Sequence, residues 1–179
     1  MTRKPPTRSP APSLRFPLEE VAAWAGRYTA KHSDTDVEAL VAPVRARGHL
    51  TFDELYAVAH WKSARSAGNA RRNDQAYVAE VTAMALAART ERARIEVLLC
   101  LDGVSWPTAS VILHFFHADP YPILDVRALW SLRTLPPAQY QFAFWWSYVE
   151  ATRELAAGAK VDMRTLDRAL WMYSAARQR

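Results

Sequence analysis

Residues 98–130 read LLCLDGVSWPTASVILHFFHADPYPILDVRALW and are the most informative part of this sequence. Two apolar segments of helical periodicity meet there at Asp102-Gly103-Val104-Ser105, a connection so short that the two helices must be antiparallel neighbours. Glycine at position 103 permits the positive φ that such a turn needs. The helix after the turn begins with N–H groups that have no acceptor inside the helix, and a phosphate is a natural ligand for them. The pattern fits two interpretations: a hairpin that holds one DNA phosphate, and a plain helical hairpin with a glycine turn.

Helical periodicity continues on both sides of this stretch. Apolar residues recur at three- and four-residue spacing from Leu18 onward, and the sequence has no sustained two-residue alternation of the kind that indicates strands. We therefore predict an all-α fold, a bundle of about nine helices. The expected helices are a first over 19–31, one capped by Asp34 or Ser33 and interrupted at Pro43, one from Asp125 to about Pro136, one over 138–156 and a last from Asp162. Between them we expect a helix stop at Gly48, a capping box at Thr51–Glu54 and helix caps at Asn73 and Thr90.

The composition of the 179-residue chain narrows the class of protein. Its hydrophobic content is 50% and its charged content 23%, which is typical of a globular protein. The single cysteine, Cys100, excludes an internal disulfide, a multi-cysteine zinc site and a four-cysteine iron–sulfur cluster. The net charge of +5 permits a nucleic-acid partner without requiring one. Because no apolar run reaches the roughly 18 residues of a membrane span and no secretory signal is evident, we expect a cytoplasmic protein with no membrane partner.

Residues 1–16 differ in composition from the rest of the chain. They are rich in proline and in basic residues and cannot bury apolar area, so we predict a disordered basic tail. Such a tail is either a solvated terminus or a weak, non-specific contact to DNA. Residues 17–179 are about the length of one domain and contain no internal repeat, so we expect a single helical domain that acts as a monomer.

Two motifs in the informative stretch carry a family resemblance. Residues 101–109, LDGVSWPTA, are similar to the helix-hairpin-helix of the base-excision DNA glycosylase superfamily, which reads Leu-Pro-Gly-Val-Gly-x-x-Thr-Ala at this place. Residues 124–127, LDVR, resemble the later segment of that family in which an aspartate heads a helix. Pro107 takes the place of the family's lysine, and the 18 residues from Pro107 to Asp125 match the spacing of endonuclease III-like members. The rest of the chain agrees with the family as a helical pattern of compatible length.

The resemblance implies an all-α, glycosylase-like fold of two lobes with a base pocket between them. In that fold Gly103, Val104, Ser105 and Thr108 hold the backbone of double-stranded DNA through the hairpin, and Asp125 faces a nucleotide flipped out of the duplex. Asp125 is the candidate catalytic residue, because an ionised carboxylate beside the sugar stabilises the positive charge that develops there as the base departs. The same aspartate is also well placed as an ordinary helix N-cap.

Three residues depart from the family pattern. Pro107 replaces the lysine that forms a Schiff base in bifunctional members, so we predict a monofunctional DNA glycosylase that acts on a damaged or mispaired base. Ser105 replaces a glycine, and its side chain either crowds the phosphate or caps the helix. Asp102 replaces a proline and places negative charge beside the proposed phosphate site. The alternative function is a non-catalytic DNA-binding or protein-interaction module on the same fold.

The second group of DNA-binding candidates is basic. The segment 62–72 reads as a loop with the densest positive charge in the chain, and in the resembling family a loop in this region inserts into the gap left by the flipped base. The alternative is a solvated basic loop. Next to Asp125, a further arginine pairs either with that carboxylate or with a phosphate. The candidates are Lys62, Arg65, Arg71, Arg72 and Arg127.

Histidines and aromatic residues suggest further sites that we consider less favoured. His114 and His117 are three residues apart on one predicted helix, but helical zinc pairs usually stand four apart, and no third ligand is evident, so we expect no metal and no cofactor. Aromatic residues are dense over 142–148, where they could stack on bases. The three- and four-residue spacing of Phe142, Trp145 and Val149 favours a core helix instead.

Overall fold

The structure, a computed structural model, describes residues 12–28 and 34–178. Over these residues it is all-helical, which confirms the predicted fold class, with ten α-helices where the sequence indicated about nine. Within the described part of the chain, no helix combines the length and apolar character that crossing a membrane demands. The elements are the 3₁₀ helices η1 (Leu18–Glu20), η3 (Ala67–Arg72) and η4 (Val97–Cys100), and the α-helices α1 (Val21–Ala25), α2 (Thr35–Glu38), α3 (Val41–Arg47), α4 (Phe52–Lys62), α5 (Gln75–Ala87), α6 (Glu91–Glu96), α7 (Trp106–Phe116), α8 (Val126–Ser131), α9 (Phe142–Ala159) and α10 (Met163–Arg177).

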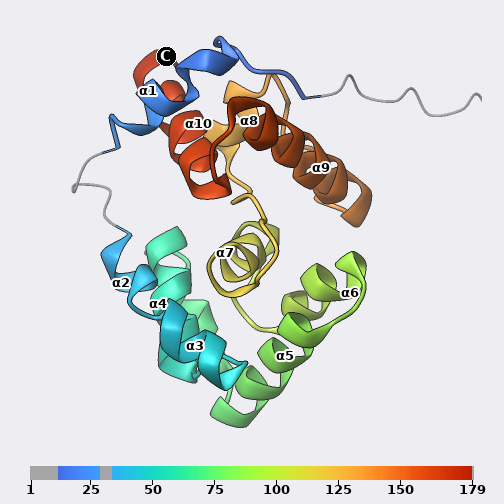
Figure 1. Ribbon diagram of the computed structural model, residues 1–179. Coiled ribbons are helices and arrows are strands. Elements are labelled where there is room, and N and C mark those ends of the chain that lie inside the picture. The colour runs from blue at the N-terminus through green and yellow to red at the C-terminus, as the bar shows by residue number, and fades with distance from the viewer. Residues whose placement is uncertain (1–11, 29–33, 179) are drawn as a thin grey trace, which may run out of the picture.

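The helices form two groups with α7 between them (Figure 1). We call the group of α1, α8, α9 and α10 the terminal group, and the group of α2 to α6 the middle group. The described part of the chain starts in the terminal group, passes through the middle group and returns by way of α7. The first and last helices, α1 and α10, therefore pack side by side. The boundary between the two groups is where distant parts of the sequence meet.

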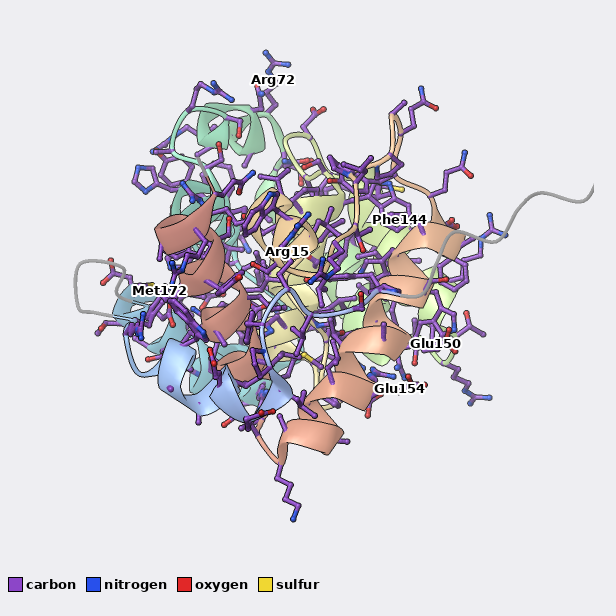
Figure 2. The ribbon with its side chains drawn as sticks, turned by 90° about the horizontal axis from the view of Figure 1, so that it is seen from above. Arg15, Arg72, Phe144, Glu150, Glu154 and Met172 are labelled. Atoms are coloured by element: carbon purple, nitrogen blue, oxygen red, sulfur yellow. The ribbon has the colours of Figure 1, made fainter. Side chains whose placement is uncertain are left out.

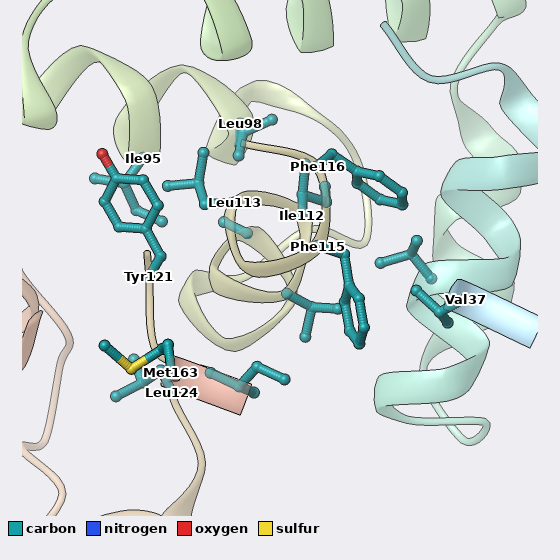
Figure 3. Close-up of a cluster of buried hydrophobic side chains, with 14 of the residues drawn as sticks. Val37, Ile95, Leu98, Ile112, Leu113, Phe115, Phe116, Tyr121, Leu124 and Met163 are labelled. Carbon is teal, nitrogen blue, oxygen red and sulfur yellow. The ribbon is translucent and has the colours of Figure 1, made fainter. Parts of the chain in front are cut away.

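Helix α7 is the centre of the hydrophobic core. Most of its side chains are buried, including the polar Thr108 and Ser110. Figure 3 shows Ile112, Leu113 and Phe116 of this helix among apolar side chains that come from both sides. A helix that is apolar around most of its circumference is stable only when other elements surround it. The position of α7 between the groups follows from this composition.

Several local signals in the sequence are confirmed. Thr51 accepts the N–H of Glu54, and the Glu54 carboxylate accepts the N–H of Thr51, which completes the predicted capping box of α4. Gly48 ends α3 with φ of 80°, and the Thr90 side chain caps α6. Pro43 lies in the first turn of α3, where its missing N–H costs no helical hydrogen bond, so the interruption falls before Val41.

The predicted cap at Asn73 is wrong, and Asp34 stands at the predicted N-cap of α2 without capping it through its side chain, because both side chains have distant partners. The side-chain Nδ2 of Asn73 donates a hydrogen bond to the carbonyl oxygen of Asp102, and Oδ1 of Asn73 accepts the N–H of Asp102, both at 2.9 Å. Asp74 caps α5 in its place by accepting the N–H of Tyr77 at 2.8 Å. Asp34 precedes α2 but makes no capping bond with its side chain, which is directed to arginines of α10. The other candidate cap, Ser33, lies outside the described residues.

Helix boundaries differ from the expected ones where the backbone turns early. Helix α8 ends at Ser131 rather than near Pro136, because Arg133 adopts a left-handed conformation with φ of 54° and the N–H of Thr134 bonds Leu129 O at 2.9 Å. Helix α9 begins at Phe142 rather than at 138. The first helix is also shorter than 19–31, since α1 ends at Ala25 and residues 29–33 are not described.

The predicted tail boundary at residue 16 is too late. The N–H groups of Ser13 and Arg15 bond Leu132 O and Ser131 O at 3.1 and 2.9 Å, and Phe16 is buried. The Arg15 guanidinium also lies over the Trp130 ring, 4.4 Å from its centroid. Residues 13–16 thus belong to the packed domain, and residues 1–11 lie outside the described part.

The turn before α7 is packed against η3. Gly103 has φ of 77°, as the sequence predicted, and a Cβ added to it would lie 2.5 Å from Ala70 N and 2.8 Å from Asn69 C. Because backbone atoms occupy this space, only glycine fits. The two hydrogen bonds between Asn73 and Asp102 hold the same contact. The hairpin and the basic segment 62–72 are therefore joined in one surface.

A cluster of charged side chains joins the two groups at α2 and α10. Asp34, 3% exposed, accepts hydrogen bonds from Arg164 Nε at 2.9 Å and from Arg168 at 2.7 Å, and Tyr28 donates to its other oxygen. Burial by itself raises the pKa of Asp34, but the hydrogen bonds and charges of the two arginines outweigh it, so this pKa lies below its usual value. The carboxylate is thus ionised and paired across the boundary.

The substitution Gly103→Ala tests the contact between the hairpin and η3. We expect it to destabilise the fold more than Gly48→Ala does, because both glycines have positive φ but only the Cβ at 103 meets backbone. Backbone strain costs about 1 kcal/mol at either site, and overlap at 103 adds about 2 kcal/mol. Thermal unfolding of the two variants measures the difference, and equal loss in both would contradict the packing of the turn.

The substitution Asp34→Asn tests the charged cluster between the groups. Two arginines would lose a buried partner, so we expect about 3 to 5 kcal/mol of destabilisation at neutral pH. Because the folded-state pKa of Asp34 is lowered, its stabilisation is present above the unfolded-state pKa and is lost as the pH falls through the folded-state value. Urea unfolding over pH 2 to 7 should therefore show a shallower acid loss in the variant. The exposed pair Arg92–Glu96 provides the control, since Glu96→Gln should hardly move the midpoint.

Candidate functional site

Asp125 lies at the start of α8, as the sequence predicted. Its backbone is extended, with φ of −140°, and its Oδ1 accepts the N–H of Arg127 at 2.8 Å. The segment before it, Asp119 to Leu124, contains two prolines and stays outside any helix. The carboxylate is therefore oriented by its own helix, with Oδ2 directed away from the capping bond.

Lys62 reaches this carboxylate from the other helix group. Its Nζ lies 2.6 Å from Asp125 Oδ2, and the two side chains are 12% and 25% exposed. Lys62 is the last residue of α4, so the pair spans the boundary between the groups. Burial by itself raises the pKa of Asp125, but the charge and hydrogen bond of Lys62, with the N–H of Arg127, outweigh burial and hold this pKa below its usual value. Asp125 is an ionised carboxylate in a partly dry setting.

The pair lies in the wall of a pocket of about 360 Å³ between α4, α8 and α10. That volume is within the range of small-molecule sites. Its wall combines aromatic rings with charged groups, which suits a flat polar ring such as a nucleobase. The lining residues are Tyr28, Trp61, Lys62, Ile123, Asp125, Ala128, Arg164, Asp167, Arg168 and Trp171.

A second carboxylate, Asp167, lines the same pocket in a different environment. It accepts the N–H of Ile123 at 3.1 Å and a hydrogen bond from Arg164 at 3.0 Å, and the residue is 6% exposed. Burial of the carboxyl raises the pKa of Asp167 to about 7, against the lowering effect of Arg164. The pocket therefore holds two carboxyl groups whose pKa values are shifted in opposite directions. This contrast is the usual arrangement of an acid and a base in one site.

The hairpin candidates are only partly at the surface. Gly103 and Ser105 are exposed, whereas Val104 and Thr108 are buried. The N–H of Val104 bonds Leu101 O at 3.1 Å, so this N–H already has a partner within the turn. The Ser105 hydroxyl makes no capping bond, which leaves the N–H groups at the start of α7 without a side-chain acceptor.

The basic candidates separate into three places. Arg71 and Arg72 are in η3 rather than in a loop, and Figure 2 shows Arg72 projecting from the edge of the molecule. The Arg71 guanidinium lies over the Tyr56 ring, 3.9 Å from its centroid, and Arg65 is exposed just before η3. The other two candidates, Lys62 and Arg127, lie at the pocket. Lys62 pairs with Asp125. The Arg127 guanidinium lies 5.1 Å from the centroid of the Trp171 ring, which lines the pocket.

Sequence reasoning missed the contribution of α10. Arg164, Asp167 and Trp171 line the pocket, and they belong to one face of this helix at three- and four-residue spacing. An aspartate in the middle of that face was the available signal, because a charged residue on the buried side of an amphipathic helix has to have a partner.

His114 and Trp145, from the histidine and aromatic candidates, lie in the core. His114 accepts or donates a hydrogen bond with Tyr121 O at 2.6 Å, and burial lowers the pKa of His114 to about 4, so it is a neutral core residue. In the described ranges no three metal-ligating side chains come together. Trp145 is fully buried, as expected for a core helix.

No protein-family model, no curated protein and no solved structure matches this chain. The resemblance of the hairpin and of the Asp125 segment to the glycosylase superfamily therefore stays a prediction from the sequence. The carboxylate of Asp125, the amine of Lys62 and the pocket meet at the boundary between the helix groups.

Proposed function

We propose that this protein binds double-stranded DNA and removes a damaged or mispaired base from it by hydrolysis of the N-glycosidic bond. The observation that carries the proposal is the ionised carboxylate of Asp125 in the wall of an aromatic-lined pocket of about 360 Å³. A base enters such a pocket only after it has been flipped out of the duplex. The resemblance of residues 101–109 and 124–127 to the glycosylase superfamily supports the same assignment.

The chemistry needs a negative charge beside the sugar. As the base departs, positive charge develops on the deoxyribose, and a fixed carboxylate in a partly dry site stabilises it. Asp125 is fixed by two bonds, one from the N–H of Arg127 and one from Lys62. Little reorganisation is required of it when the base leaves.

The surface for DNA is the joined surface of the hairpin and η3. Exposed Gly103 and Ser105 lie at the start of α7, and the contact of Gly103 with Asn69 and Ala70 places them beside the arginines of η3. Phosphates would be held by N–H groups at the turn and by the arginine side chains. The carboxylate of Asp102 in the same turn opposes this binding and limits its strength at low salt.

The substitution Asp125→Asn tests the catalytic role. An asparagine can still accept the N–H of Arg127, so the helix cap is kept while the charge is lost. We expect base release to fall by a factor of about 100 or more, with duplex binding unchanged or stronger. Release is measured on duplexes that each carry one alkylated, deaminated or oxidised base. Asp162 caps α10 in the same way outside the pocket, so Asp162→Asn should leave base release unchanged.

Measurements of base release and duplex binding also separate base excision from the two alternative functions, non-catalytic DNA binding and protein interaction. Base release by the wild type that survives Asp125→Asn would contradict the catalytic role of this carboxylate. Duplex binding without release from any substrate would favour the non-catalytic DNA-binding module. If the wild type binds no duplex even at low salt, a protein-interaction role becomes the better hypothesis.

A salt titration tests the DNA-binding surface. The double variant Arg65→Ala, Arg72→Ala removes two exposed charges beside the hairpin. If both contact phosphates, the slope of log affinity against log salt should become shallower by about 1.8. Arg177, at the end of α10, is exposed in the terminal group, so Arg177→Ala should keep the wild-type slope. Equal slopes in all three proteins would place the DNA-binding surface elsewhere.

A further inference from the structure

We propose that Lys62 is a second catalytic residue, an amine that forms an imine with the deoxyribose left after base removal and so cleaves the strand at that position. The inference rests on the proposed function, because the product of base hydrolysis is an abasic sugar whose C1′ is an aldehyde in its open form. Primary amines attack such carbonyl groups, and lysine is the side chain that does so in proteins. An amine in the pocket where the aldehyde forms therefore has a substrate made in place.

The geometry brings the amine to the reacting carbon. Lys62 Nζ lies 2.6 Å from Asp125 Oδ2, so a sugar carbon in contact with this carboxylate is also within reach of the amine. The lysine side chain is 12% exposed and lines the pocket. By contrast, Lys160 follows α9 and is exposed to solvent. The hairpin has no amine at position 107, where a proline stands, and the amine in the pocket comes from Lys62 of α4.

The step needs no oxidant, reductant or metal. The neutral amine of Lys62 adds to C1′, and loss of one water gives a protonated imine. A base then removes a proton from C2′, and the C3′–O bond breaks. The strand segment on the 3′ side of the sugar leaves and keeps the phosphate. Water hydrolyses the imine, which restores the amine and releases an unsaturated aldehyde on the other strand end.

Asp125 is the proton acceptor that these reaction steps require. The amine must lose a proton before it attacks, and the carboxylate is already hydrogen-bonded to it. Once the base has departed and the sugar carries no positive charge, the carboxylate is free to take this proton across the existing hydrogen bond. The same carboxylate that stabilises the sugar during base departure is then positioned to move protons in the second step.

The experiment uses a duplex with one abasic site, which does not require the damaged base to be known. The full-length protein is incubated with it and with cyanoborohydride, which reduces an imine to a stable covalent bond. We expect one protein–DNA adduct, and peptide mass spectrometry should place it at Lys62. Strand cleavage without the reductant should accompany it. The variant Lys62→Arg keeps the positive charge beside Asp125 but cannot form the imine, so adduct and cleavage should both be lost.

Matched controls separate chemistry from folding and binding. Lys160→Arg should give the wild-type amount of adduct. Thermal unfolding and binding of the abasic duplex should be nearly unchanged in Lys62→Arg, because arginine can keep the ion pair. If the variant unfolds early, the site of the adduct in the wild type decides the question by itself.

The outcomes distinguish this inference from the proposed function. An adduct at the N-terminal amine or at Lys160, or base release without any adduct, overturns the role of Lys62 and leaves base excision standing. Failure to bind the abasic duplex together with failure to release any base overturns both. An adduct at Lys62 that disappears in Lys62→Arg supports the assignment.

Discussion

A carboxylate that is removed from water has to meet a cation or give up its charge, and this constraint shapes the boundary between the two helix groups. Asp34 of the middle group is paired with Arg164 and Arg168 of α10, and Asp125 of the terminal group is paired with Lys62 of α4. In each case the partners come from opposite groups. The pairs therefore fix how the groups meet, and the pocket lies where they do so.

The same constraint has the opposite result at Asp167. This carboxyl is buried, and burial raises its pKa to about 7, while the pKa of Asp125 in the same pocket is lowered by Lys62 and the N–H of Arg127. One pocket thus contains an ionised carboxylate, a carboxyl that carries a proton below neutral pH, and an amine. Such a set of groups suits reactions that develop positive charge and move protons, which is why we assign chemistry rather than simple binding to this place.

The pocket and the candidate DNA surface are mechanically connected. Lys62 ends α4, and five residues later the chain enters η3, whose Ala70 backbone packs on Gly103 of the hairpin. Asn73 closes the contact through the backbone of Asp102. A phosphate held at this surface would be held at a fixed distance from the pocket, because short, packed segments link the two. Rigid placement of this kind is what positions a substrate for reaction.

Signals that act over a few residues could be predicted from the sequence. The helical class, the capping box at Thr51, the glycine turn at 103 and Asp125 as the start of a helix depend on neighbours along the chain, and the structure contains all of them. The pairing of Lys62 with Asp125 could not be predicted, since 63 residues separate them and either charge could as well have been solvated. Asn73 shows the same limit, because a side chain that can cap a helix locally can also bond a backbone 29 residues away. The packing of apolar helices around α7 decides which of these partners a polar side chain takes. Burial there leaves each polar group only the partners that packing brings within reach.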